Sequence, residues 1–176
     1  NIDSLSQKNL FAIIFKTLLE GNVKGYLIPS DKLTPPPCIA KYEYDVQKDM
    51  VERLFGGDED YANDYKKIEF ITQGIIKYYI QEVWYFAKHS SMMRSAILSI
   101  APVYNKAYNE TYDPAGEVDE GVMCWIPFER LRPYLQVEFM KTTGRNVNPV
   151  VDFDNFFADR QFDSYIIKDY DVRGTL

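Results

Sequence analysis

Hydrophobic and polar residues follow a distinctive pattern in the middle of the chain, where two apolar runs flank a short polar patch. The runs cover residues 75–88 and 92–103, are rich in β-branched and aromatic residues, and are separated by His89, Ser90 and Ser91. This pattern predicts a long β-hairpin, and a helix over residues 75–88 is the competing interpretation. Because an isolated hairpin is only marginally stable in water, we expect the rest of the chain to cover it.

Alternation along the two strands predicts which side chains share a face. The shared faces hold these residues: Tyr78, Ile80, Trp84 and Phe86 on the first strand; Ala96, Leu98 and Ile100 on the second. A three-residue turn would place Trp84 opposite Ala96, and Ile80 opposite Ile100. We predict that Trp84 lies mainly in the core, so that Trp84→Ala would cost about 3–5 kcal/mol through cavity formation.

The flanking segments predict helices near residues 7–20, 45–55, 128–136 and 153–162. Ser6 and Asp152 are expected to act as N-caps, and Gly21 is expected to follow the end of the first helix. Short strands are predicted at 23–28, 68–72 and 122–126, and residues 163–168 either continue the final helix or form a strand. We therefore predict an α+β fold: a mainly antiparallel sheet built on the central hairpin, covered by several helices, as a single domain over residues 1–176.

Composition narrows the class of protein. The 176 residues carry a net charge of −6, which disfavours a general nucleic-acid binder. No apolar run approaches the roughly 20 residues that a membrane-spanning helix needs. Tyrosine and phenylalanine are frequent, at 14 and 11 residues, which suits either a protein interface or a core with hydroxyl groups at its edge.

The residues give little support to catalysis. His89 is the single histidine, and no nucleophile elbow, phosphate loop, dinucleotide fingerprint or metal spacing is present. Cys38 and Cys124 could pair, but we favour two buried thiols. Five carboxylates are candidates for glycoside hydrolysis, although the sequence places no two of them at a required separation: Glu82, Asp119, Glu120, Asp152 and Asp154. We predict no enzyme activity, no cofactor and no metal.

Some residues are candidates for binding or for structural contacts. The run Pro35-Pro36-Pro37 is either a docking segment or a stiff linker. Tyr108 and Tyr112, in a polar loop, are expected to meet a partner. Glu82 lies in the middle of an apolar strand, where a charge is costly unless it is paired, and we predict Lys88 or Arg94 as its partner.

Five stretches are familiar when they are taken together and in order. Residues 9–26 give a leucine-rich helix followed by Glu-Gly-Asn-Val-Lys-Gly-Tyr; residues 80–92 read Ile-Gln-Glu-Val-Trp-Tyr-Phe-Ala-Lys-His-Ser-Ser-Met. Residues 97–102 read Ile-Leu-Ser-Ile-Ala-Pro; residues 125–135 read Trp-Ile-Pro-Phe-Glu-Arg-Leu-Arg-Pro-Tyr-Leu; and residues 153–168 read Phe-Asp-Asn-Phe-Phe-Ala-Asp-Arg-Gln-Phe-Asp-Ser-Tyr-Ile-Ile-Lys. In this order the chain resembles the gliding-motility GldN / PorN family. Ala87 and Ser99 depart from the family pattern, which has Asp and Gly there. The chain begins at Asn1 and lacks the family's N-terminal segment, so we expect a processed or trimmed chain.

The resemblance implies a periplasmic structural component of the type IX secretion system of Bacteroidetes, associated with the outer membrane through a partner. It implies a ring formed with an outer-membrane lipoprotein of PorK / GldK type, and a contact with the periplasmic part of a PorM / GldM-type protein. Within the matched stretches, Glu82, Trp84, Trp125 and Arg160 are expected to be structural. The alternative is a cell-wall-associated enzyme or peptidoglycan-binding module. A carboxylate pair in a deep cleft would favour that alternative, whereas a broad aromatic patch or an uncovered strand edge would favour assembly.

Overall fold

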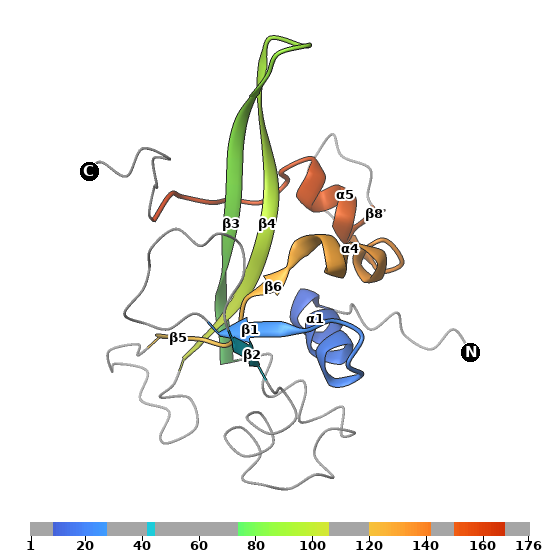
Figure 1. Ribbon diagram of the computed structural model, residues 1–176. Helices are drawn as coiled ribbons and strands as arrows, with labels where there is room; N and C mark the ends of the chain where they lie inside the picture. Colours follow the sequence, from blue (N-terminus) through green and yellow to red (C-terminus); the bar gives the residue numbers. More distant parts are fainter. Residues whose placement is uncertain (1–8, 28–41, 45–73, 106–119, 142–149, 168–176) are drawn as a thin grey trace, which may run out of the picture.

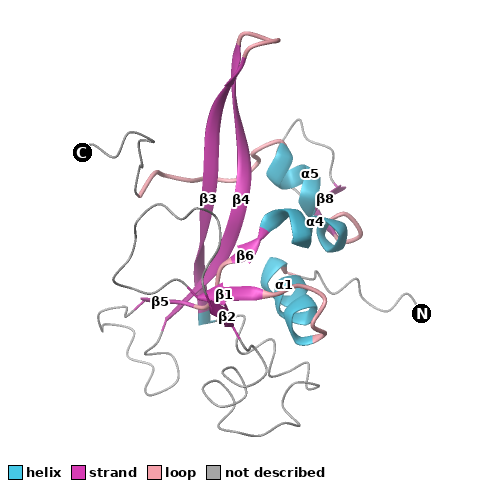
Figure 2. Ribbon diagram, in the orientation of Figure 1, coloured by secondary structure: helices cyan, strands magenta, loops and turns pink. Residues whose placement is uncertain are grey.

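The computed structural model of the chain describes residues 9–27, 42–44, 74–105, 120–141 and 150–167. Their elements form an α+β fold with mainly antiparallel pairing, as the sequence predicts (Figures 1 and 2). The helices are α1 (Leu10–Leu19), α4 (Phe128–Leu135) and α5 (Phe153–Ala158). The strands are β1 (Gly25–Leu27), β2 (Tyr42–Tyr44), β3 (Ile75–Ala87), β4 (Met92–Asn105), β5 (Glu120–Val122), β6 (Ile126–Pro127), β7 (Phe139–Lys141) and β8 (Val150–Asp152).

The β3–β4 hairpin dominates the sheet. Strands β3, β4 and β5 pair in that order, and β6 also pairs with β4. Strands β1 and β2 form a separate pair, which is tied to the main sheet by two backbone hydrogen bonds of 2.8 Å between Tyr26 and Trp125. Strands β7 and β8 form a third pair. The hairpin prediction is therefore confirmed, and the competing helix over residues 75–88 is wrong.

The hairpin register changes partway along the strands. Ile80 lies opposite Ile100 as predicted, but Trp84 lies opposite Ser95 and not Ala96. The cause is a bulge, because Gln81 pairs with Ser99 while Glu82 pairs with Ile97. The extra residue is Leu98, and a bulge of this kind bends and twists the strand that carries it.

The bulge also changes which β4 side chains face the core. Ile97 and Ile100 both pack against the core although they are three residues apart, which strict alternation does not allow. The sequence predicted that Ala96, Leu98 and Ile100 share one face. This prediction is wrong for Ala96 and Leu98, because Ile97 shares the core face with Ile100.

Helices α1, α4 and α5 lie on one side of the inner part of the hairpin (Figure 1). They bury a single apolar cluster against β4 and β6, and the fully buried members include Phe11, Ile14, Phe15, Ile100, Ile126, Leu131 and Leu135. Tyr78 and Ile80 of β3 pack against this cluster. The core therefore supports only the inner part of the hairpin.

The ends of α1 follow from local hydrogen bonding. The side chain of Asn9 accepts a hydrogen bond of 2.8 Å from the Ala12 backbone N–H, so Asn9 is the N-cap; the predicted cap, Ser6, lies outside the described residues. Gly21 has a φ of 70°, and the N–H groups of Gly21 and Asn22 donate to the carbonyls of Leu18 and Thr17. This is the glycine-ended helix stop that the sequence predicts.

The other predicted elements differ in extent or lie elsewhere. Helix α5 starts at the predicted cap, Asp152, but ends at Ala158, four residues early; residues 161–167 form neither helix nor strand. Pro133 lies inside α4, which nevertheless continues to Leu135. The predicted helix 45–55 and strand 68–72 lie outside the described residues.

Cys124 is a free, buried thiol next to Gly25, and burial raises the pKa of this thiol to about 12. A Cβ atom on Gly25 would lie 2.6 Å from the Cys124 sulfur, so glycine permits this close approach of β1. The thiol is therefore a packing group, as predicted; Cys38 lies outside the described residues.

Candidate functional site

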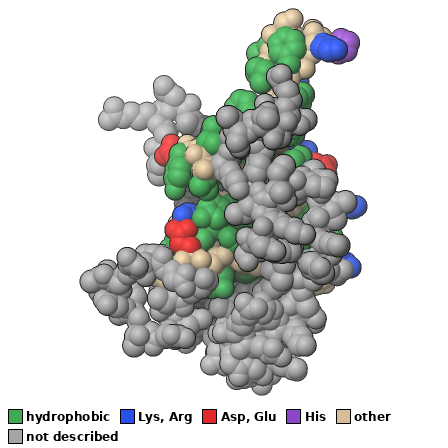
Figure 3. Space-filling view, turned by 60° about the vertical axis from the view of Figure 1, so that its left-hand side comes forward, with side chains coloured by type: hydrophobic (Ala, Val, Ile, Leu, Met, Phe, Trp, Pro, Cys, Tyr) green, Lys and Arg blue, Asp and Glu red, His purple; other side chains and the backbone are tan. Residues whose placement is uncertain are grey.

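The outer end of the hairpin projects beyond the helices that cover its inner part (Figure 1). We call residues 83–94 the arm. Hydrophobic side chains gather on the arm, with basic groups at its tip (Figure 3). The exposed large apolar residues of the arm are Val83, Trp84, Tyr85, Phe86, Met92 and Met93. Apolar patches that remain exposed on a folded domain mark interaction sites more often than chance.

The arm is apolar on both faces. Consecutive residues of a strand point to opposite faces, so Tyr85 lies on the face opposite to Trp84 and Phe86. All three side chains are exposed. Apolar contacts are therefore available on both faces of the arm.

The basic groups of the arm lie in the turn and on β4 just after it. Residues 88–91 connect the strands, one residue more than the predicted three-residue turn, and Ser91 adopts a φ of 51°. The Ser90 N–H donates to the Ala87 carbonyl at 3.1 Å, which closes the turn. Lys88, His89 and Arg94 are all exposed, so the arm combines apolar side chains with basic groups.

Arg160 fastens the base of the arm to the end of α5. Its guanidinium donates hydrogen bonds to Glu82 Oε1 at 2.6 Å and to Ser95 Oγ at 3.2 Å, so it contacts both strands. The same group lies 5.3 Å from the Trp84 ring centroid and 5.4 Å from that of Phe162. We call these five residues the clasp: Glu82, Trp84, Ser95, Arg160 and Phe162.

Arg160 has a backbone conformation that is unusual for a residue with a side chain. Arg160 directly follows the C-cap of α5, with a φ of 52°, and its N–H donates to the Phe157 carbonyl at 3.1 Å. Glycine usually occupies this left-handed position, and another residue costs about 1–2 kcal/mol there. The contacts of the guanidinium group offset that cost, which indicates that the clasp is a built feature of the fold.

The clasp corrects two predictions. Trp84 is 55% exposed and does not lie mainly in the core. The partner of Glu82 is Arg160, in place of the predicted Lys88 or Arg94. The Glu82 side chain is only 14% exposed, so the strand charge is indeed paired, but by a residue that lies 78 positions further along the chain.

The corrected position of Trp84 changes the expected effect of Trp84→Ala. The substitution removes one cation–π contact and part of an exposed ring, so we expect a loss of about 1 kcal/mol in the free energy of unfolding. Urea denaturation monitored by far-UV circular dichroism measures it. A loss of 3 kcal/mol or more would show that the ring is buried after all.

The inner end of the hairpin has its own polar anchor. Lys77 Nζ lies 2.6 Å from Glu120 Oε1, and the Tyr79 hydroxyl donates to Glu120 Oε2 at 3.1 Å. The hydrogen bond from Lys77 lowers the pKa of Glu120. This contact ties β3 to β5 across β4.

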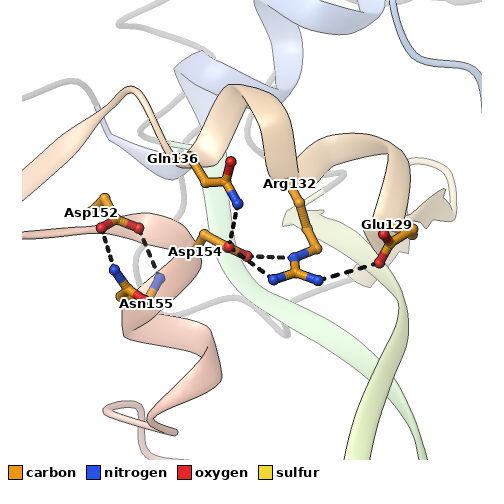
Figure 4. A network of polar contacts seen from close by, with 6 residues as sticks. All are labelled: Glu129, Arg132, Gln136, Asp152, Asp154 and Asn155. Carbon is orange, nitrogen blue, oxygen red and sulfur yellow. Dashed lines mark hydrogen bonds and ion pairs between the residues drawn. The ribbon is translucent and has the colours of Figure 1, made fainter.

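A second polar network joins α4 to α5 (Figure 4). Arg132 donates two hydrogen bonds to the Asp154 carboxylate, at 2.8 and 3.1 Å, and Gln136 donates a third at 2.8 Å. The bond from Arg132 lowers the pKa of Asp154, so the buried carboxylate is held ionised. Asp152 caps α5 by accepting from the Asn155 N–H.

These contacts bear on the hydrolase alternative. A general acid needs a raised pKa, whereas the pKa values of Glu120 and Asp154 are lowered by their partners. Glu82 and Asp152 are engaged with Arg160 and Asn155, and Asp119 lies outside the described residues. Among the described residues there is also no cluster of metal-ligating side chains. The four candidate carboxylates that the structure describes are therefore all engaged in structural contacts.

The sequence identified part of this surface. It singled out Glu82, Trp84 and Arg160 separately, and the structure brings them into one clasp. Tyr108, Tyr112, Pro35, Pro36 and Pro37, the predicted contact residues, lie outside the described residues. Phe86, Met92 and Met93 were not recognised as surface residues, although apolar side chains at successive strand positions signal that both faces need cover.

Comparison with known proteins gives a match over almost the whole chain. A family model described as gliding motility associated protein GldN matches residues 4–176. No curated protein matches the chain. No described helix is long and apolar enough to cross a membrane.

Proposed function

Because the chain belongs to the GldN family of components of the gliding motility and type IX secretion machinery, we propose that it is a structural ring subunit of that machinery in the periplasm. Its proposed partners are an outer-membrane lipoprotein of PorK / GldK type, which holds it at the outer membrane, and the periplasmic part of a PorM / GldM-type protein. The family match over residues 4–176 carries this proposal.

The arm supports a role in assembly. It exposes six large apolar side chains at the outer end of the hairpin, and the clasp holds the base of the arm. A surface of this kind costs solubility unless a partner covers it, and it does not form a cleft that would enclose a small substrate. The aromatic patch is the feature that favours assembly over the cell-wall alternative.

Size-exclusion chromatography with light scattering tests the proposal. The chain is run alone, the lipoprotein is run alone, and the two are then run as a mixture. We expect the mixture to give one stable peak whose mass exceeds the sum of one copy of each protein. Two separate peaks at the masses of the single proteins would contradict the proposal.

A further inference from the structure

The exposed arm poses the question of what covers it. We propose that the arm of one copy docks on the extended segment 163–167 of a second copy, so that copies associate head to tail. This inference rests on the proposed function as a ring subunit and names the contact between neighbouring subunits.

Segment 163–167 matches the arm in chemistry. Tyr165, Ile166 and Ile167 are 75%, 82% and 62% exposed, and the segment forms neither helix nor strand. Asp163, which opens the segment, is exposed and is the one charged residue of the segment. The segment is therefore apolar with one acidic side chain, whereas the arm is apolar with two basic side chains.

The charges of the whole chain point the same way. The arm carries a formal charge of +2, from Lys88 and Arg94, within a chain of net charge −6, so the remaining residues carry −8. An arm-to-arm contact would bring like charges together, whereas an arm-to-body contact joins opposite charges. Charge complementarity therefore selects the body of another copy over its arm.

Geometry places the two surfaces of one copy apart. The segment leaves the clasp at the base of the arm and crosses the hairpin (Figure 1). Beyond Trp84, the arm residue that belongs to the clasp, β3 continues for three residues to Ala87 and the turn follows. The outer end of the arm therefore extends beyond the segment of its own copy, where the segment of a second copy can reach it (Figure 1).

Backbone pairing is available to such a contact. β3 is the first strand in the sheet order β3–β4–β5, so beyond the clasp the arm has a strand edge that no described strand covers. An extended segment can add to an open edge through main-chain hydrogen bonds. Because the arm and the segment are different surfaces, repeating this contact builds a ring or a filament and not a closed pair.

Photo-crosslinking from the arm tests the proposal. Benzoylphenylalanine replaces Phe86 in the full chain. Isotope-labelled and unlabelled copies are mixed in two samples, one without and one with the lipoprotein partner. We expect crosslinks from position 86 to residues 163–167, joining labelled to unlabelled copies. The matched control carries the probe at Phe139, which is 59% exposed against 58% for Phe86, and we expect at least tenfold less of this product from it.

The outcomes separate this inference from the proposed function. Crosslinks from position 86 only to the lipoprotein, only within one copy, or equally from position 139 would overturn the inference and leave the heteromeric complex standing. Crosslinks between copies in a sample that never binds the lipoprotein would support the inference and contradict the proposed function. A lack of crosslinks between copies in both samples would also overturn the inference.

Charge exchange gives a second, independent readout. Lys88→Glu and Asp163→Lys are made singly and together. Each reversal places like charges at the contact, and we expect each to lower the yield of the 86-to-segment crosslink by about tenfold. The double variant should recover most of the yield, and Glu129→Lys, an exposed reversal on α4, should leave it unchanged. Loss without recovery in the double variant would overturn the pairing of these two surfaces.

Discussion

Phe15→Ala is expected to lower the free energy of unfolding by about 3–5 kcal/mol, the largest effect of a single substitution that we predict. The Phe15 ring is fully buried in the cluster that α1 forms with α4 and β4, and it stacks on Phe11 with centroids 5.6 Å apart. Truncation loses the free energy that is gained when the ring is transferred from water to the core, and it leaves a cavity. Urea denaturation monitored by circular dichroism measures the loss.

Phe86→Ala is the matched control for this substitution. It removes the same atoms from a ring that is 58% exposed on the arm, so its effect on unfolding should stay within about 0.5 kcal/mol. Equal losses for the two variants would mean that the arm belongs to the core and is no interaction surface.

Asp154→Ala is expected to cost about 2–4 kcal/mol. The Asp154 side chain is 8% exposed and accepts three hydrogen bonds, two of them from Arg132. Removing one partner of a buried pair leaves the other uncompensated, and we reduce the usual penalty because the Arg132 side chain is 42% exposed. Thermal and urea unfolding of the variant at neutral pH measure the cost, and a loss below 0.5 kcal/mol would contradict this role.

The contribution of Asp154 should also depend on pH. Its pKa is lowered in the folded chain, chiefly by the hydrogen bond from Arg132, relative to about 3.9 in an unfolded chain. The stabilisation is therefore fully present above about pH 4 and is lost as the pH falls through the lowered pKa. The stability difference between the wild type and Asp154→Asn should shrink below pH 4. A difference that stays constant down to pH 2 would exclude this linkage.

Local patterns were sufficient to predict much of the fold. The alternation on either side of His89 predicted the hairpin, and the Asp152 cap and the Gly21 stop predicted two helix ends. Each of these features depends on a few neighbouring residues, so a single sequence is enough to predict it. The end of α5 was placed four residues late because the backbone reverses at Arg160, a residue type that rarely adopts a positive φ.

Long-range contacts explain what the sequence could not predict. The extra residue at Leu98 shifts the register by one, and no glycine or other local signal marks it. Trp84 lies in the predicted strand, but its burial depends on how far the helices extend along the hairpin, and its side chain is 55% exposed. The partner of Glu82 lies in a segment that only the folded chain brings close to the hairpin.

The same reasoning applies to the candidate site. The sequence identified three members of the clasp because a charged or aromatic residue stands out in an apolar strand or helix edge. It did not identify the arm as a surface. A strand that is apolar on both faces has the same sequence pattern whether its own chain or a partner covers it. Only the position of the core, on the inner half of the hairpin, distinguishes these two cases.

Amide hydrogen exchange tests the central claim, that the arm is an assembly surface, most directly. Exchange is followed by mass spectrometry for the chain alone and for the chain with its lipoprotein partner. We predict that peptides covering residues 83–94 exchange rapidly in the chain alone and become protected in the complex, whereas peptides of α1 are protected in both. Rapid exchange of the arm in both samples, in a complex that has formed, would contradict the claim.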